Sequence, residues 1–200
     1  MSPLLIDRDV RLKLNETEPP SYQLADCFGD FFPPEIEERI RGLNQDFPLI
    51  GLKPQTAAGQ ISYGQWLLYT TVCLTGQICN GGVEGFFANC PGLIRDAAVL
   101  LEEWAKPELA QAYKTAAEPF LDVIQSHAAA GPTATGKELD EFWVGFEAAF
   151  DRFDEDAANK IEVALYDAGR DDDTENWFFA LEVRVLDFVL ENRGHFQQSV

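Results

Sequence analysis

The chain reads SYGQWLLYTTVCLTGQICNGGVEGFFAN from residue 62 to residue 89, and this stretch decides the expected fold. Ser62 is a residue type that caps helix N-termini. The side chains from Trp66 to Ile78 leave almost no polar face, which is typical of a helix that is buried on all sides. The stretch therefore predicts a central helix that begins at Ser62.

The second half of this stretch carries a motif of small and aromatic residues. Its members are Asn80, Gly81, Gly82, Phe86, Phe87 and Asn89. The Asn-Gly-Gly triplet predicts a helix stop, because Asn and Gly tolerate the left-handed conformation found just beyond a helix end. The two Phe side chains are expected to fill the core beneath that stop, in a short helical turn ending near Asn89. We therefore interpret the motif as structural.

Helical spacing of apolar residues continues on both sides of the central stretch. It covers, approximately, residues 34–46, 91–106, 107–127, 139–153, 161–165 and 174–194. No alternation of strand and helix patterns suggests a parallel sheet. The sequence predicts an all-α fold, a compact multi-helix domain of about seven helices, with residues 61–200 as its main helical domain.

Residues 1–60 differ in character from the rest of the chain, because seven prolines divide them into short pieces. We expect a proline-rich, irregular N-terminal appendage or cap. Val10, Leu12 and Leu14 alternate with basic residues, which would suit an extended arm lying on the body.

Composition excludes several classes of protein. The chain has 200 residues and 46% hydrophobic residues, which is too apolar for a disordered protein. Its formal net charge of −19 repels nucleic acid and anionic membranes, so we expect no direct nucleic-acid binding and no membrane association. No signal peptide and no membrane-spanning stretch is visible, and four scattered cysteines suit a reducing compartment. A cytoplasmic protein is expected.

No catalytic, metal-binding or cofactor-binding residues stand out. The two histidines, His127 and His195, are isolated from the cysteines, so a local zinc site cannot be assembled. Asp171–Asp173 with Glu175 could collect calcium, but they lack the glycine of an EF-hand loop and suit a solvated helix cap better. The protein is expected to be non-enzymatic. One alternative remains open: a small-molecule-binding or hydrolytic helical domain with Asn80 or Asn89 at the edge of an aromatic pocket.

The negative charge is concentrated in the last third of the chain. Residues 137–200 carry 17 acids and 6 bases, a net charge of −11. Residues three or four apart on a helix are neighbours, so Asp151, Asp154, Glu155 and Glu162 can form a row of carboxylates. Such a row would resemble a phosphate backbone to a basic protein. The alternative is that the acidity serves only to keep an interaction module of unknown function in solution.

The stretch Gln77–Asn89, QICNGGVEGFFAN, resembles the signature of the DNA-mimic protein family. The helices that follow it and the closing stretch 185–192 are also similar to that family, so the resemblance covers roughly residues 62–200. The resemblance implies a compact all-helical fold. For the characterised type it also implies an acidic surface that occupies the DNA-binding face of a transcription factor and relieves repression.

The leading hypothesis is therefore a regulator of transcription that competes with DNA for a basic DNA-binding protein. The expected partner-binding residues are Asp151, Asp154, Glu155, Asp156, Glu162, Asp171, Asp172, Asp173 and Glu175. Self-association into a homodimer is left open.

Overall fold

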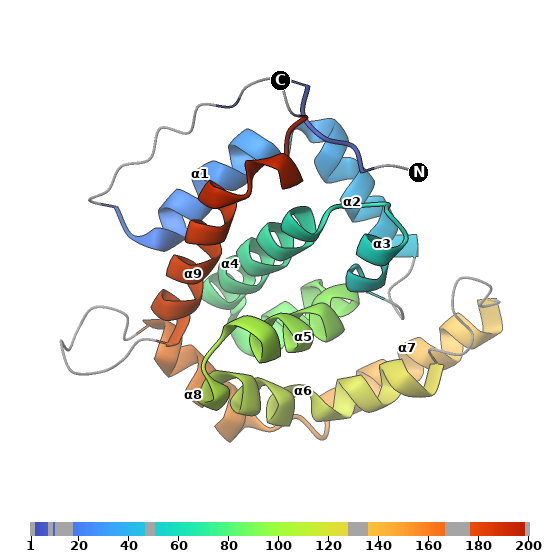
Figure 1. The fold of residues 1–200 in the computed structure, drawn as a ribbon. Helices are drawn as coiled ribbons and strands as arrows, with labels where there is room; N and C mark the ends of the chain where they lie inside the picture. Colours follow the sequence, from blue (N-terminus) through green and yellow to red (C-terminus); the bar gives the residue numbers. More distant parts are fainter. Residues whose placement is uncertain are drawn as a thin grey trace.

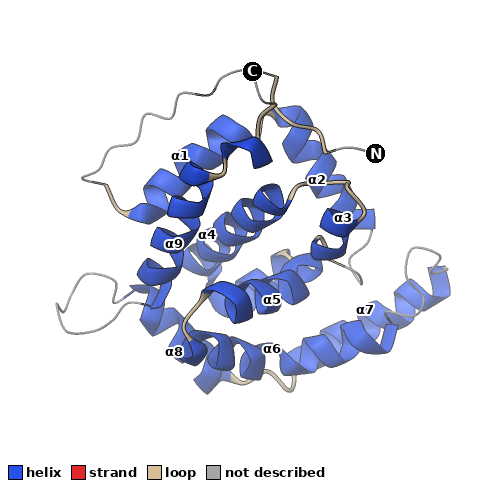
Figure 2. Ribbon diagram, viewed as in Figure 1, coloured by secondary structure: helices blue, strands red, loops and turns tan. Residues whose placement is uncertain are grey.

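The computed structural model describes residues 3–7, 10, 18–46, 51–127, 136–166 and 177–198 (Figure 1). The helices are α1 (Pro20–Phe31), α2 (Pro34–Asp46), α3 (Lys53–Ala57), α4 (Tyr63–Asn89), α5 (Ile94–Trp104), α6 (Pro107–His127), α7 (Gly136–Phe150), α8 (Glu155–Tyr166) and α9 (Trp177–Glu191), with 3-10 turns η1 (Pro91–Leu93) and η3 (Arg193–His195). The described residues contain no strand (Figure 2), which confirms the all-α prediction.

Helix α4 lies at the centre, in contact with α1, α5, α8 and α9. It begins as predicted at Ser62, whose Oγ accepts a hydrogen bond from Gln65 N at 3.1 Å. In return, Gln65 Oε1 accepts one from Ser62 N at 2.9 Å, which completes a capping box. Because Ser62 and Gln65 satisfy each other's backbone N–H groups, the start of α4 is fixed by local hydrogen bonds. The apolar side chains of α4 then pack against α1, α5, α8 and α9.

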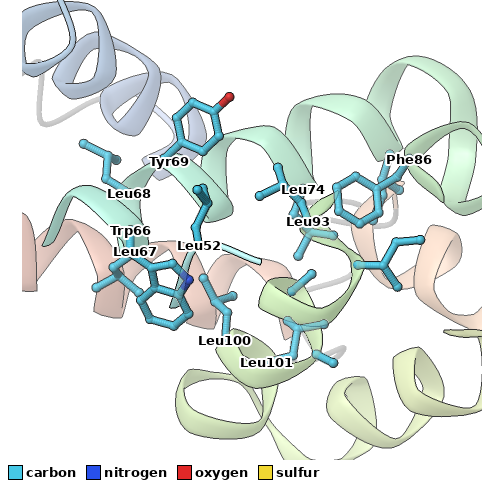
Figure 3. Close-up of a cluster of buried hydrophobic side chains, with 14 of the residues drawn as sticks. Leu52, Trp66, Leu67, Leu68, Tyr69, Leu74, Phe86, Leu93, Leu100 and Leu101 are labelled. Carbon is cyan, nitrogen blue, oxygen red and sulfur yellow. The ribbon is translucent and has the colours of Figure 1, made fainter. Parts of the chain in front are cut away.

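The core is continuous around α4. Figure 3 shows Trp66 and Leu67 of α4 near Leu100 of α5, and Leu74 of α4 near Leu93 of η1. A second cluster surrounds the motif residue Phe87, whose ring lies 4.8 Å from Phe120, 5.7 Å from Tyr113 and 5.8 Å from Phe153 between centroids. Edge-on aromatic contacts of this kind stabilise a core beyond the area they bury. The expected role of Phe86 and Phe87 as core residues is confirmed, since both are fully buried.

The described residues contain more helices than the seven expected. The two additional ones, α1 and α3, lie within residues 1–60, which are predicted to be irregular. Helix α1 packs on α4 and α9 through Leu24, Cys27 and Phe31. Helix α3 is a short turn beside α4. The predicted helix over residues 34–46 is present as α2. The first sixty residues thus supply side chains to the common core.

The N-terminal arm lies along the C-terminal end of the chain, as Figure 1 shows. Ile6 N donates to Phe196 O and Gln198 N donates to Ile6 O, each at 2.9 Å. Arg193 also donates to the carbonyl of Val10 at 3.1 Å. Of the residues predicted to form an extended arm, Val10 is described and buried, whereas Leu12 and Leu14 lie outside the described residues, so the arm over these residues stays a prediction.

Candidate functional site

Helix α7 has one buried face and one acidic face. Phe142, Phe146 and Ala149 are buried against α6, where the Phe146 ring lies 5.1 Å from that of Phe120. The opposite face carries Asp140 and Glu147, both exposed. Positions 140, 144 and 147 follow helical spacing, so Asp140 and Glu147 share one side of α7 with the exposed Val144 between them, and Asp151 follows directly after the last residue of the helix.

The predicted partner-binding carboxylates divide into two groups by their environment. Asp151, Glu155 and Asp156 are exposed. Asp154 instead caps α8, because its Oδ1 accepts a hydrogen bond from Ala157 N at 2.8 Å. Asp171, Asp172, Asp173 and Glu175 lie outside the described residues. Their role in partner binding stays a prediction.

Three carboxylates that the sequence analysis did not name extend the exposed group: Asp140, Glu141 and Glu147. The sequence contains a signal for them, because the apolar spacing of α7 leaves these three positions off the buried face of the helix. We call the six exposed residues Asp140, Glu141, Glu147, Asp151, Glu155 and Asp156 the α7–α8 acidic surface.

Few cations offset this charge. Residues 136–166 carry nine acids and three bases, a net charge of −6. Among the described residues, one ion pair involves the α7–α8 acidic surface. Lys137 Nζ lies 3.6 Å from Glu141 Oε1, and both side chains are highly exposed. Such pairs contribute little in water. The surface therefore retains most of its negative potential.

Glu162 serves the backbone of α4. The two halves of α4 meet at Gly82, which has φ 70° and ψ −177°. Glu162 Oε1 accepts a hydrogen bond from Val83 N at 2.8 Å, at the start of the second half. A carboxylate is favoured at a helix N-terminus. A Cβ on Gly82 would lie 2.5 Å from the same oxygen, so both the backbone conformation and the space require glycine.

The break at Gly82 brings distant parts of α4 together. In a straight helix Gln77 and Asn89 would be about 18 Å apart along the axis, at 1.5 Å per residue. Here Asn89 Nδ2 donates to Gln77 Oε1 at 3.2 Å. Asn80 Nδ2 donates to the carbonyl of Gly76 at 2.8 Å. The interruption expected at Asn80–Gly82 is observed at Gly82, and the helical turn after it ends at Asn89 as predicted.

These polar side chains border a half-open cleft of about 620 Å³ between α2, α4, η1 and α7. Arg41 and Tyr69 also line it, together with Phe28 and Trp143. The sequence alternative of an aromatic pocket with Asn80 or Asn89 at its edge anticipated such a feature.

The two thiols of the cleft are poor nucleophiles. Burial raises the pKa of Cys73 to about 12 and also raises the pKa of Cys90. Since the thiolate is the reactive form, both residues are protonated and inert near neutral pH. The four cysteines are free in the structure.

Two buried carboxylates lie away from the acidic surface. Asp96 of α5 is 1% exposed and accepts hydrogen bonds from Leu52 N, Lys53 N and Trp66 Nε1 at 2.6–2.8 Å. Burial outweighs these bonds and raises the pKa of Asp96 to about 6. Glu182 of α9 is 6% exposed, and burial raises its pKa to about 7. The three hydrogen bonds give Asp96 a structural role.

The raised pKa of Glu182 predicts that the free energy of unfolding depends on pH. Its folded-state pKa exceeds the ordinary value of 4.5, so the folded chain binds the proton more tightly than the unfolded chain. Folding stability should therefore rise as pH falls from 8 to 5.5, with Glu182 contributing on the order of 2 kcal/mol. Urea unfolding of the wild type and of Glu182→Gln measures this contribution as the difference between their pH profiles. Parallel profiles would contradict it.

The described residues show neither a helix long and apolar enough to cross a membrane nor a cluster of three or more potential metal ligands. The helices of the described residues and the net charge of −19 define an acidic, all-helical protein. Residues 59–182 match the DMP19-like protein family. That match covers more than half of the chain, so the chain belongs to this family of DNA-mimic proteins, which are generally non-enzymatic. No curated protein and no solved structure matches the chain.

Proposed function

We propose that this protein binds a basic DNA-binding protein through the α7–α8 acidic surface and competes with DNA for it. Asp171–Asp173 and Glu175 are proposed to extend the same surface. The observation that carries the proposal is the exposure of six carboxylates on two consecutive helices and the turn between them, with little compensation by neighbouring cations. Membership of a family of DNA mimics supports the same conclusion.

The physical basis is electrostatic. On the outward face of α7, Asp140 and Glu147 lie about 10 Å apart along the axis, because seven residues separate them at 1.5 Å each, and the exposed Val144 lies between them. Cationic side chains that normally neutralise phosphates can pair with such charges and release counterions on both sides. Association of this kind is fast and weakens steeply with salt. A transcription factor held in this way cannot bind its operator.

A capture experiment tests the proposal. The immobilised protein, incubated with extract of its native cell at low salt, should retain a basic DNA-binding protein. Duplex DNA or high salt should release that protein, because both compete for the same cationic surface. The variant Asp151→Asn, Glu155→Gln, Asp156→Asn should retain less of that protein. Its matched control carries Asp26→Asn, Glu35→Gln and Glu38→Gln, which remove the same number of charges from exposed positions on α1 and α2. Retention of no DNA-binding protein at low salt would refute the proposal.

A further inference from the structure

The cleft between α2, α4 and α7 is kept open by a glycine that packing does not require. Gly76 lies inside α4 and lines the cleft, and a Cβ built on it would meet no atom within 4 Å. Glycine inside a helix destabilises it relative to alanine, and here no close contact demands the missing side chain. Its effect is to leave the floor of the cleft bare.

The polar edge of the cleft presents a matched donor and acceptor. Asn89 Nδ2 donates to Gln77 Oε1, so the Nε2 group of Gln77 keeps its donors and Oδ1 of Asn89 keeps its acceptor. Asn80 uses its amide nitrogen on Gly76 O, which leaves its Oδ1 as a second acceptor. A donor and an acceptor side by side are what a single Asn or Gln amide offers to the edge of a base, and here two paired side chains supply them.

The charge of the cleft is balanced. Its charged lining residues are Glu37 and Arg41, which pair with each other one helical turn apart on α2. The thiols of Cys73 and Cys90 are neutral at physiological pH, as argued above. A balanced site within a protein of net charge −19 favours a neutral ligand over an anion.

Aromatic side chains supply the apolar part. Phe28 of α1 and Trp143 of α7 line the cleft, and Trp143 is 40% exposed although it is large and apolar. Stacking on such rings favours flat, conjugated ligands. The volume of about 620 Å³ falls within the range of small-molecule sites.

We propose that this cleft binds a neutral planar heterocycle that carries an amide-type hydrogen-bonding edge, of the nucleobase or nicotinamide kind. The ring lies over Gly76, against the apolar wall, and its edge pairs with Gln77 Nε2 and Asn89 Oδ1. The site borders the α7–α8 acidic surface at Trp143, which neighbours Asp140 and Glu147 on α7, but its lining contains none of the six carboxylates and the proposal does not depend on the partner proposed above.

The test uses the full chain and three neutral probes: adenosine, uridine and nicotinamide. Amide NMR spectra are recorded with each probe up to about 10 mM, the weak end of affinity for ligands of this size. At least one probe should shift the side-chain amides of Gln77 and Asn89 and the Trp143 indole in a saturable manner. For adenosine, replacement by AMP should weaken binding by about tenfold, because of the phosphate charge.

Three glycine variants separate binding from folding. Gly76→Phe fills the cleft and should weaken binding about tenfold or more. Gly76→Ala reports on folding: its unfolding midpoint should rise by about 2–4 °C, since alanine favours the helix. The binding control is Gly42→Ala on α2, which lies outside the cleft lining and whose Cβ would also meet no atom within 4 Å; it should bind the probes as the wild type does. Capture of the DNA-binding partner should be equal in all three variants. Absence of saturable shifts with all three probes, or equal binding by Gly76→Phe, would overturn the proposal and leave the partner proposal untouched.

Discussion

The triple variant Asp151→Asn, Glu155→Gln, Asp156→Asn is expected to bind the captured DNA-binding protein on the order of 30-fold more weakly than the wild type. Each exposed charge pair contributes up to about 1 kcal/mol, so three lost pairs account for roughly 2 kcal/mol. The slope of log affinity against log salt should also fall by about 2–3, because three fewer cationic partners are neutralised. Titration by fluorescence anisotropy at several salt concentrations measures both quantities.

The control triple variant at Asp26, Glu35 and Glu38 should keep the wild-type affinity and slope within about twofold, since only the long-range field changes. Circular dichroism checks that both variants stay helical, because Glu155 and Asp156 also favour the start of α8 through the helix dipole. If both triple variants lose affinity equally, net charge alone governs binding. The acidity would then be a general property and not a site.

Asp96→Ala should produce the largest loss of stability, about 3–5 kcal/mol. The substitution leaves the buried indole N–H of Trp66 and the amides of Leu52 and Lys53 without their acceptor. These three bonds hold Leu52 and Lys53, at the start of α3, against α4 and α5. The packing around the carboxylate is close, because a Cβ on Gly51 would lie 2.5 Å from it. Chemical denaturation at pH 7.5 measures the loss.

A substitution of an exposed carboxylate on α5 shows how much of the expected loss of stability comes from burial. Glu102 of α5 is exposed and pairs with Lys114 at 2.9 Å, so Glu102→Ala should cost less than about 1 kcal/mol. Asp96→Asn keeps one carbonyl oxygen as acceptor and should fall between these values. A loss for Asp96→Ala no greater than for Glu102→Ala would show that the buried hydrogen bonds contribute nothing net.

The central helix was predictable because local signals agreed there. Ser62 caps it, apolar residues cover it on all sides, and Gly82 interrupts it. Helix α1 is not predicted from the sequence because Pro19 and Pro20 suggest a break in the chain, although proline is favoured in the first turn of a helix, where Pro20 lies. The spacing of Leu24, Cys27 and Phe31 could have identified it.

The site was only partly predictable from sequence. Asp151, Glu155 and Asp156 are exposed, as a partner-binding surface requires, whereas Asp154 and Glu162 make backbone caps. The role of Glu162 depends on how α8 packs against the Gly82 break in α4, and sequence spacing carries no information about that. The cleft was named only as an alternative, because its walls come from helices far apart in the chain.

Displacement of DNA is the most direct measurement of the central claim. A labelled operator duplex is bound by the captured DNA-binding protein, and this chain is then titrated into the complex. The proposal predicts complete release of the duplex, at concentrations that rise for the α7–α8 triple variant and not for the control variant. Formation of a ternary complex that still contains the duplex would contradict competition for the DNA-binding face.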